Sequence, residues 1–94
     1  MNLTWSHRAR RDLRELITFI AEDSVYGAEA VADRILKAAE LLTDFPRSGR
    51  NGRVPGTRER VVSKTPYILV YRIISGRIRV LRVYHSARRW PKQF

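Results

Sequence analysis

The chain begins with a short alternating segment, Leu3-Thr4-Trp5, and continues with apolar residues that recur at helical spacing. The alternation and the β-forming side chains predict a strand over residues 3–5. Ser6 stands where a helix N-cap is expected, because its hydroxyl can accept a hydrogen bond from the first-turn backbone. The helix is predicted to end near Asp23-Ser24, and its apolar stripe comprises Ala9, Leu13, Leu16, Ile17 and Ile20.

A second helix is predicted to follow a turn at Tyr26-Gly27 and to stop at Pro46, which cannot continue a helix. Its apolar positions alternate between spacings of three and four: Ala28, Val31, Ile35, Ala38, Leu42 and Phe45. Two amphipathic helices joined by a short turn form an antiparallel hairpin.

The second half of the chain predicts strands. Residues 46–58, with three glycines, two prolines and four arginines, are expected to form a basic, flexible loop without a regular element. Ser75-Gly76 has the residue types of a hairpin turn, and strands are predicted for Arg58–Ser63, Tyr67–Ile74 and Arg77–Tyr84. Tight turns make these strands antiparallel neighbours, and one face of their sheet must pack on the helix pair.

The last predicted strand has no cleanly apolar face. Strict alternation points the side chains of one set to one face of the sheet: Ile78, Val80, Arg82 and Tyr84. The other face receives Arg79, Leu81, Val83 and His85. This pattern favours a central position in the sheet.

Length and composition indicate one small cytoplasmic domain over residues 1–94. The chain has no cysteine, which excludes disulfides and thiolate metal sites and suits a reducing compartment. Its apolar runs are far shorter than the ~20 residues of a membrane span, and the N-terminus lacks the apolar segment of a signal peptide. We therefore expect no membrane partner.

The charge is distributed unevenly. The net charge is +10, and residues 46–94 hold thirteen Lys and Arg but one acid, Glu59, whereas residues 1–45 hold six Lys and Arg and eight acids. Such segregation favours a surface for nucleic acid or an acidic protein, although a merely solvated basic face would give the same composition.

Cations also crowd the start of the first predicted helix, where His7, Arg8, Arg10 and Arg11 stand. The helix dipole favours anions at this end, so these side chains slightly oppose helix stability. Either an anionic partner binds nearby, or the placement has no functional meaning.

Four segments, in this order and at these intervals, resemble the ParE/RelE family of toxins from type II toxin–antitoxin systems: Ala9-x3-Leu13, Phe45-Pro46-Arg47-Ser48-Gly49-Arg50, residues 65–73 (TPYILVYRI) and residues 80–91 (VLRVYHSARRWP). The resemblance covers nearly the whole chain. It implies an α+β fold, with an N-terminal strand and a two-helix antiparallel hairpin packed on a curved antiparallel sheet that contains three C-terminal strands. It also implies a cognate antitoxin with an acidic wrapping segment. From the residues themselves we expect no metal and no cofactor, because two histidines far apart in sequence and no thiols form no recognisable metal site.

The family has two branches. RelE-like members cleave messenger RNA on the ribosome, and ParE-like members inhibit DNA gyrase. RelE-like nucleases usually carry an arginine in the strand that reads Arg-Leu-Val-Tyr, where this chain has Ile68. Because isoleucine cannot stabilise phosphate charge, this departure favours the ParE-like branch and a protein that is not an enzyme.

The ribonuclease alternative depends on His85, because an imidazole side chain could serve as general acid or base. In that case Arg82 and Arg88 would supply the cations that the transition state needs. The competing interpretation is a histidine at a strand end that bonds the backbone. A third possibility is a nucleic-acid-binding module without toxicity.

The expected surface for the target or the antitoxin lies in the basic half. Trp90 can either stack on a base or pack against the sheet edge, and packing is the commoner role of a tryptophan in so small a core. The full set of candidate binding residues is Arg50, Arg53, Arg58, Arg72, Arg79, Arg89 and Trp90.

Overall fold

The computed structural model describes residues 2–92 and 94. Strand β1 (Asn2–Trp5) leads into helices α1 (His7–Ala21) and α2 (Val25–Asp44). The chain then forms four more strands, β2 (Arg50–Asn51), β3 (Arg58–Val61), β4 (Tyr67–Ile74) and β5 (Arg77–His85). The expected α+β class, the helix hairpin and the three C-terminal strands are confirmed.

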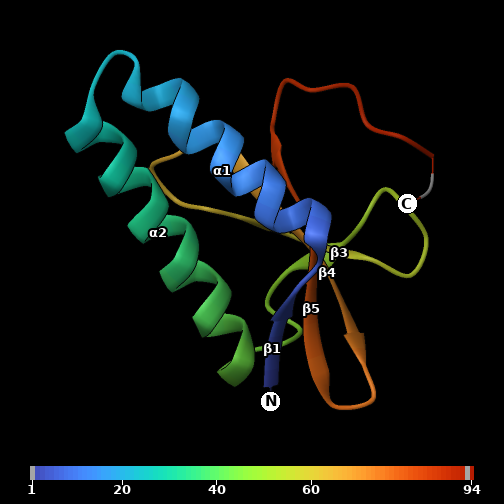
Figure 1. Ribbon diagram of the computed structural model, residues 1–94. Helices are drawn as coiled ribbons and strands as arrows, with labels where there is room; N and C mark the ends of the chain where they lie inside the picture. Colours follow the sequence, from blue (N-terminus) through green and yellow to red (C-terminus); the bar gives the residue numbers. More distant parts are fainter. Residues whose placement is uncertain (1, 93) are drawn as a thin grey trace.

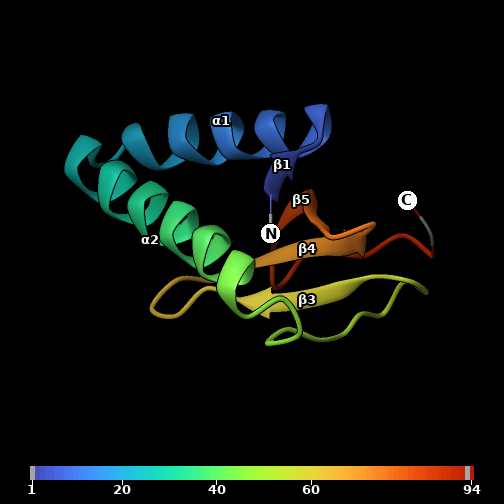
Figure 2. The same cartoon turned by 90° about the horizontal axis from the view of Figure 1, so that it is seen from below.

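The five strands form one sheet in the order β1-β5-β4-β3-β2, with both helices on one face (Figures 1 and 2). Strands β2 to β5 pair antiparallel, whereas β1 pairs parallel to β5, with Asn2 opposite Arg77 and Trp5 opposite Val80. The expected antiparallel pairing of the three C-terminal strands is confirmed, and the N-terminal strand joins them in parallel, so the whole sheet is mixed. A tight turn forces antiparallel pairing, but the long connection from β1 through two helices leaves the direction free.

Serine caps begin both helices. The Ser6 hydroxyl accepts a hydrogen bond from Ala9 N at 3.0 Å, as the sequence predicted, and the Ser24 hydroxyl accepts one from Gly27 N at 2.9 Å. The second cap moves the interhelical turn to residues 22–24, so Tyr26 and Gly27 belong to α2 and do not form the turn.

The core lies between the helices and the helix-facing side of the sheet. Small residues allow close packing, and Ala9 of α1 and Ala39 of α2 are fully buried. The remaining buried core side chains are Leu16, Ile35, Leu42, Val62, Tyr67, Leu69, Tyr71, Ile78, Val80 and Val83. No helix among the described residues is both long enough and apolar enough to cross a bilayer.

A bulge changes the predicted alternation of β5. Val70 pairs with Arg82 and the next residue, Tyr71, pairs with Val80, so Leu81 is an extra residue in β5. Beyond the bulge Val83 returns to the core side, which corrects the face predicted for the residues after Leu81. The position of β5 inside the sheet, between β1 and β4, agrees with the prediction.

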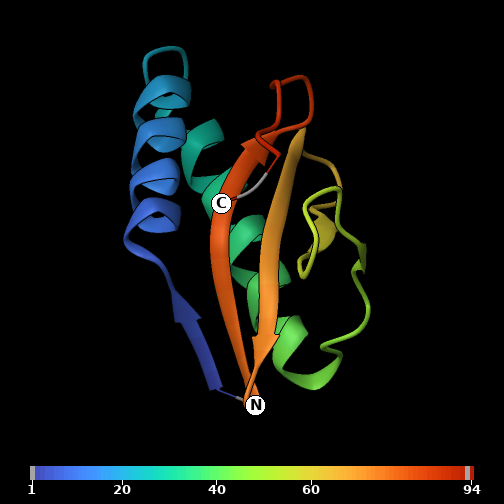
Figure 3. The ribbon, with the colours of Figure 1, turned by 90° about the vertical axis from the view of Figure 1, so that its right-hand side faces the viewer.

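The face of the sheet away from α1 and α2, which we call the outer face, is covered by the loop before β3 and by the C-terminal tail. Figure 3 views the sheet with the tail in front and α2 behind, and Figure 1 places the same loop and tail on the side opposite the helices. The outer face includes Ile68, Val70 and Tyr84, which are buried although no helix covers them. A thin second layer therefore protects this face.

Candidate functional site

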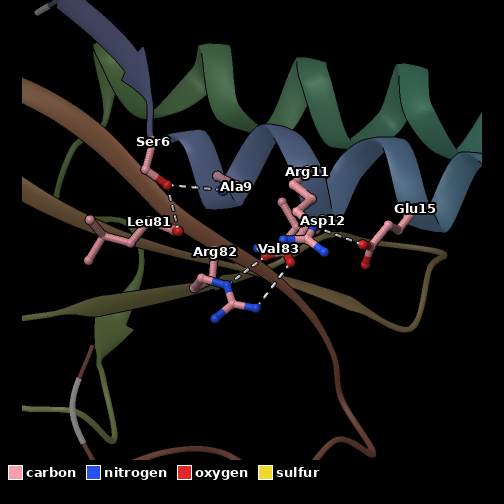
Figure 4. Close-up of polar contacts among 8 residues, drawn as sticks. All are labelled: Ser6, Ala9, Arg11, Asp12, Glu15, Leu81, Arg82 and Val83. Atoms are coloured by element: carbon pink, nitrogen blue, oxygen red, sulfur yellow. Dashed lines mark hydrogen bonds and ion pairs between the residues drawn. The ribbon is translucent and has the colours of Figure 1, made fainter.

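Helix α1 takes the place of a neighbouring strand along the C-terminal part of β5. Strand β1 ends opposite Val80, so the edge of β5 beyond that residue has no neighbouring strand. Ser6 N donates to Val80 O at 2.8 Å. The Ser6 hydroxyl donates to Leu81 O at 2.8 Å, and Asp12 Oδ2 accepts from Val83 N at 3.0 Å (Figure 4). The start of α1 thus provides hydrogen-bond partners for the backbone groups along this open edge of β5.

Arg82 is bound to the same helix. Its Nε and Nη2 donate to the two oxygens of Asp12 at 2.8 and 3.1 Å, and the two side chains are only 14% and 9% exposed (Figure 4). The hydrogen bond to Asp12 is the main cause that raises the pKa of Arg82 above its usual value. The guanidinium also lies 4.5 Å from the centre of the Tyr84 ring. The charge of Arg82 is therefore largely compensated within the protein.

His85 lies apart from Arg82. Its Nδ1 accepts a hydrogen bond from Ala87 N at 3.1 Å, and its ring meets the Tyr67 ring edge-on at 5.5 Å. His85 pairs with Tyr67, a core residue, and stands three positions after Arg82, so the two side chains leave opposite faces of β5. The Arg88 guanidinium lies 4.4 Å from the centre of the Tyr84 ring, so Arg82 and Arg88 contact the same ring. His85 lies on the other face of β5.

The C-terminal tail forms an aromatic cluster on the outer face. Trp90 meets Tyr84 edge-on at 5.0 Å, and Phe94 lies 5.9 Å from the same ring. The Arg53 guanidinium lies 3.9 Å from the centre of the Trp90 ring, a cation–π contact that joins the loop to the tail. Trp90 thus packs inside the protein, and its Nε1 is buried with no hydrogen-bond partner among the described residues.

Glu59 organises the basic loop. Its side chain is 0% exposed and accepts hydrogen bonds from Arg50 Nη2 at 3.0 Å and from Arg53 N at 2.7 Å, while Arg53 Nε lies 3.4 Å away. These contacts hold Arg50 in β2, where Arg50 pairs with Glu59. The expectation that residues 46–58 lack a regular element was therefore wrong, and the loop is anchored where we had expected flexibility.

The Tyr71 hydroxyl anchors the beginning of that loop, a role that was not expected from the sequence. The hydroxyl donates to Pro46 O at 2.7 Å and accepts from Gly49 N at 3.0 Å. A side chain on Gly49 would place its Cβ 2.8 Å from Glu59 O, so the chain passes here too closely for any residue but glycine.

The other candidate residues divide between the faces. Arg72 and Arg79 lie opposite each other on the outer face, and Arg79 Nη1 donates to Thr4 Oγ1 at 3.4 Å. Arg58 pairs with Tyr71 on the helix side and donates to Gly49 O at 2.8 Å. Arg89 is exposed and makes no ion pair or side-chain hydrogen bond within residues 2–92 and 94.

The structure also reveals a pocket of about 310 Å³ between α1 and the end of β5, lined by Arg8, Arg11, Asp12, Glu15, Arg82 and Arg88. Sequence reasoning had noted the cations at the start of the first helix but had not connected them with Arg82 and Arg88. The connection depends on the contact between α1 and β5, which the sequence does not specify.

The helix hairpin packed on a five-stranded mixed sheet agrees with the α+β fold that the sequence motifs led us to expect. Residues 3–90 match the family described as the ParE toxin of the type II toxin–antitoxin system parDE, and the chain belongs to this family. It is a toxin of a type II toxin–antitoxin system, and a cognate antitoxin is its partner.

Individual relatives agree with this assignment. The Y4kP protein of Sinorhizobium fredii is 40% identical over 90 residues, which cover 96% of this chain and 93% of the relative. The toxin RelE2 of Caulobacter vibrioides is 30% identical, over 92% of this chain and 96% of the relative. A chain from the chromosomal ParDE system of P. aeruginosa has the same fold, with a TM-score of 0.80 over 90% of this chain and 95% of that chain at 23% identity.

Proposed function

We propose that this toxin acts in the cytoplasm by binding DNA gyrase and blocking supercoiling, without itself cleaving nucleic acid. Ile68 is the observation that supports the proposal most directly. It occupies the strand position where nuclease members of the family carry an arginine, and it is 3% exposed, opposite Tyr84. A buried isoleucine supplies no charge to a phosphorane-like transition state.

The state of the neighbouring cation supports the same conclusion. Arg82 is held by both oxygens of Asp12, and His85 leaves β5 on the opposite face. General acid–base catalysis needs the proton-transferring group and the stabilising cations around one reacting phosphate. The arrangement of Arg82 and His85 does not offer such a common point, so inhibition by binding is the better explanation.

For the antitoxin, we propose an acidic segment that neutralises the outer face. Glu59 already compensates Arg50 and Arg53 in part, but both arginine side chains remain about half exposed, at 58% and 47%. Their guanidinium groups can therefore donate hydrogen bonds to further carboxylates. Arg72, Arg79 and Arg89 add positive charge to the same half of the chain, and opposite charges on the partner would speed association and fix its register.

Supercoiling of relaxed plasmid by purified gyrase tests the proposal. The full-length toxin at micromolar concentration is expected to stop supercoiling, and an excess of its antitoxin is expected to restore it. His85→Ala is the matched variant, because a toxin that acts by binding needs no proton transfer at His85. Unimpaired supercoiling at micromolar toxin would count against gyrase as the target.

One observation favours a second candidate function, messenger cleavage on the ribosome. His85 is exposed at the end of β5, and relatives named RelE are about 30% identical to this chain. A translation extract with a labelled messenger separates the two candidates. Cleavage that disappears in His85→Ala would establish the nuclease, whereas an intact messenger together with blocked supercoiling would leave gyrase as the target.

A further inference from the structure

The pocket between α1 and the end of β5 carries more positive charge than its own residues neutralise. Four arginines and two carboxylates line it, which leaves a surplus of two positive charges. Asp12 is committed to Arg82 and to the Val83 backbone, and Glu15 accepts from Arg11 Nε at 3.1 Å. Both acids are thus occupied within the protein.

Two of the four arginines remain available. Within residues 2–92 and 94, Arg8 makes no ion pair and no side-chain hydrogen bond, and the side chain of Arg88 makes only its cation–π contact with Tyr84. Arg11 uses Nε alone, so both of its terminal nitrogens are free to donate. Guanidinium donors from α1 and from the segment after β5 therefore meet around one pocket.

The backbone of α1 adds to the positive charge at this pocket. Arg8 and Arg11 lie in the first turns of α1, a helix of 15 residues with no acidic residue in its first turn. The helix dipole already places partial positive charge at this end, and the arginines increase it. The arrangement opposes stability in the empty protein and would be relieved by a bound anion.

We propose that this pocket binds a phosphate group. Arginine forks match phosphate oxygens with two parallel hydrogen bonds, and a phosphate monoester carries about 1.5 to 2 negative charges near neutral pH. That charge equals the surplus in the pocket, whereas one carboxylate would neutralise only half of it. A pocket of about 310 Å³ also has room for a phosphate with part of a nucleoside.

The proposal goes beyond gyrase inhibition and does not depend on it. It gives the toxin a direct contact with a phosphate, which can belong to free phosphate, to a nucleotide or to the backbone of a nucleic acid. The pocket is lined by residues of α1, of β5 and of the segment after β5, and none of its lining residues comes from the basic loop assigned to the antitoxin.

Isothermal titration of the full-length toxin, at constant ionic strength, tests the site. The probes are inorganic phosphate, adenosine 5′-monophosphate, a short single-stranded DNA without terminal phosphates, and glutamate. Saturable one-to-one binding of inorganic phosphate is expected. Arg8→Gln and Arg88→Gln are each expected to weaken it about tenfold, because each removes a charged hydrogen-bond donor.

Two further variants make the test specific. Arg77→Gln removes an exposed arginine at the opposite end of β5 and should change phosphate affinity less than about twofold. Glu15→Gln frees Arg11 and should strengthen binding. Circular dichroism of each variant checks that the fold is kept.

Equal weakening by Arg77→Gln, or glutamate binding as tight as that of phosphate, would overturn the proposal, as would the absence of saturable binding. Among supporting results, the source of the phosphate is identified by the probe whose affinity Arg8→Gln reduces. A response to the unphosphorylated DNA indicates a nucleic-acid backbone, and a response confined to the two small probes indicates a free phosphate or nucleotide.

Discussion

The carboxylate of Asp12 holds the guanidinium of Arg82 through hydrogen bonds of 2.8 Å to Nε and 3.1 Å to Nη2, and so joins α1 to β5 across seventy positions of sequence. Because Asp12 also accepts a hydrogen bond from Val83 N, its one carboxylate neutralises a largely buried guanidinium and binds a backbone N–H at the open edge of β5. It therefore supports the contact between helix and sheet together with the two hydrogen bonds of Ser6 to β5.

Removal of this carboxylate is therefore expected to destabilise the fold. Asp12→Ala leaves Arg82 without a counter-charge, and the free energy of unfolding should fall by about 3 kcal/mol, measured by denaturant titration. In the double variant with Arg82→Ala the loss should be smaller than the sum of the single losses, because the unpaired cation is gone. Additive losses would contradict the coupling.

Loss of charge at Glu59 is expected to loosen the basic loop. Glu59→Gln weakens the bonds to Arg50 and Arg53, each of the charged kind that contributes about 1.5–3 kcal/mol. Trypsin should then cut after these arginines about ten times faster, as measured by mass spectrometry of the products, since proteolysis follows local opening. Glu29→Gln, an exposed site on α2, is the control. An unchanged cutting rate would mean that other contacts hold the loop.

The Tyr71 hydroxyl is expected to matter more than the Tyr67 hydroxyl. Tyr71→Phe leaves Gly49 N and Pro46 O without their partner, which should cost about 1–3 kcal/mol of unfolding free energy. The Tyr67 hydroxyl makes no hydrogen bond within the described residues, so Tyr67→Phe should change stability by less than about 0.5 kcal/mol near neutral pH. Similar losses in the two variants would refute this difference.

Tyr67 is instead expected to influence stability at alkaline pH. Burial raises the pKa of Tyr67 above its usual value of 10.0. Above pH ~10 the unfolded chain releases the phenolic proton while the folded chain keeps it, so the stability due to this group is lost as the pH rises toward the folded pKa. Between about pH 9 and pH 11, Tyr67→Phe should lose less unfolding free energy than the wild type. Tyr26→Phe, at an exposed site, is the control and should behave as the wild type.

The long helices and strands could be predicted because the residue patterns that specify each of them lie within that element. The apolar stripes of both helices, the run Tyr67–Ile74 and the Ser75-Gly76 turn each lie within a few residues of one another. The interhelical turn was misplaced for a local reason too, since Ser24 competes with Tyr26-Gly27 as a signal and its hydroxyl caps α2.

The site was harder to predict because its contacts join distant positions. Glu59 was counted only as the single acid of a basic half, and its function appears when β2 brings Arg50 beside it. The bulge at Leu81 reverses the faces of the residues that follow, and no residue of β5 signals it alone. The phosphate pocket needs Arg8 and Arg88 together, eighty residues apart, and only the docking of α1 on β5 unites them.

The parallel pairing of β1 with β5 has a consequence for synthesis of the toxin. Asn2 finds its partner, Arg77, only after 75 further residues have been made, and Ser6 must wait for Val80 and Leu81. A nascent chain still lacking its final strand has an incomplete sheet and an unsupported first helix. The first helix therefore cannot dock on the sheet until β5 has been made, so the two ends of the domain must fold together.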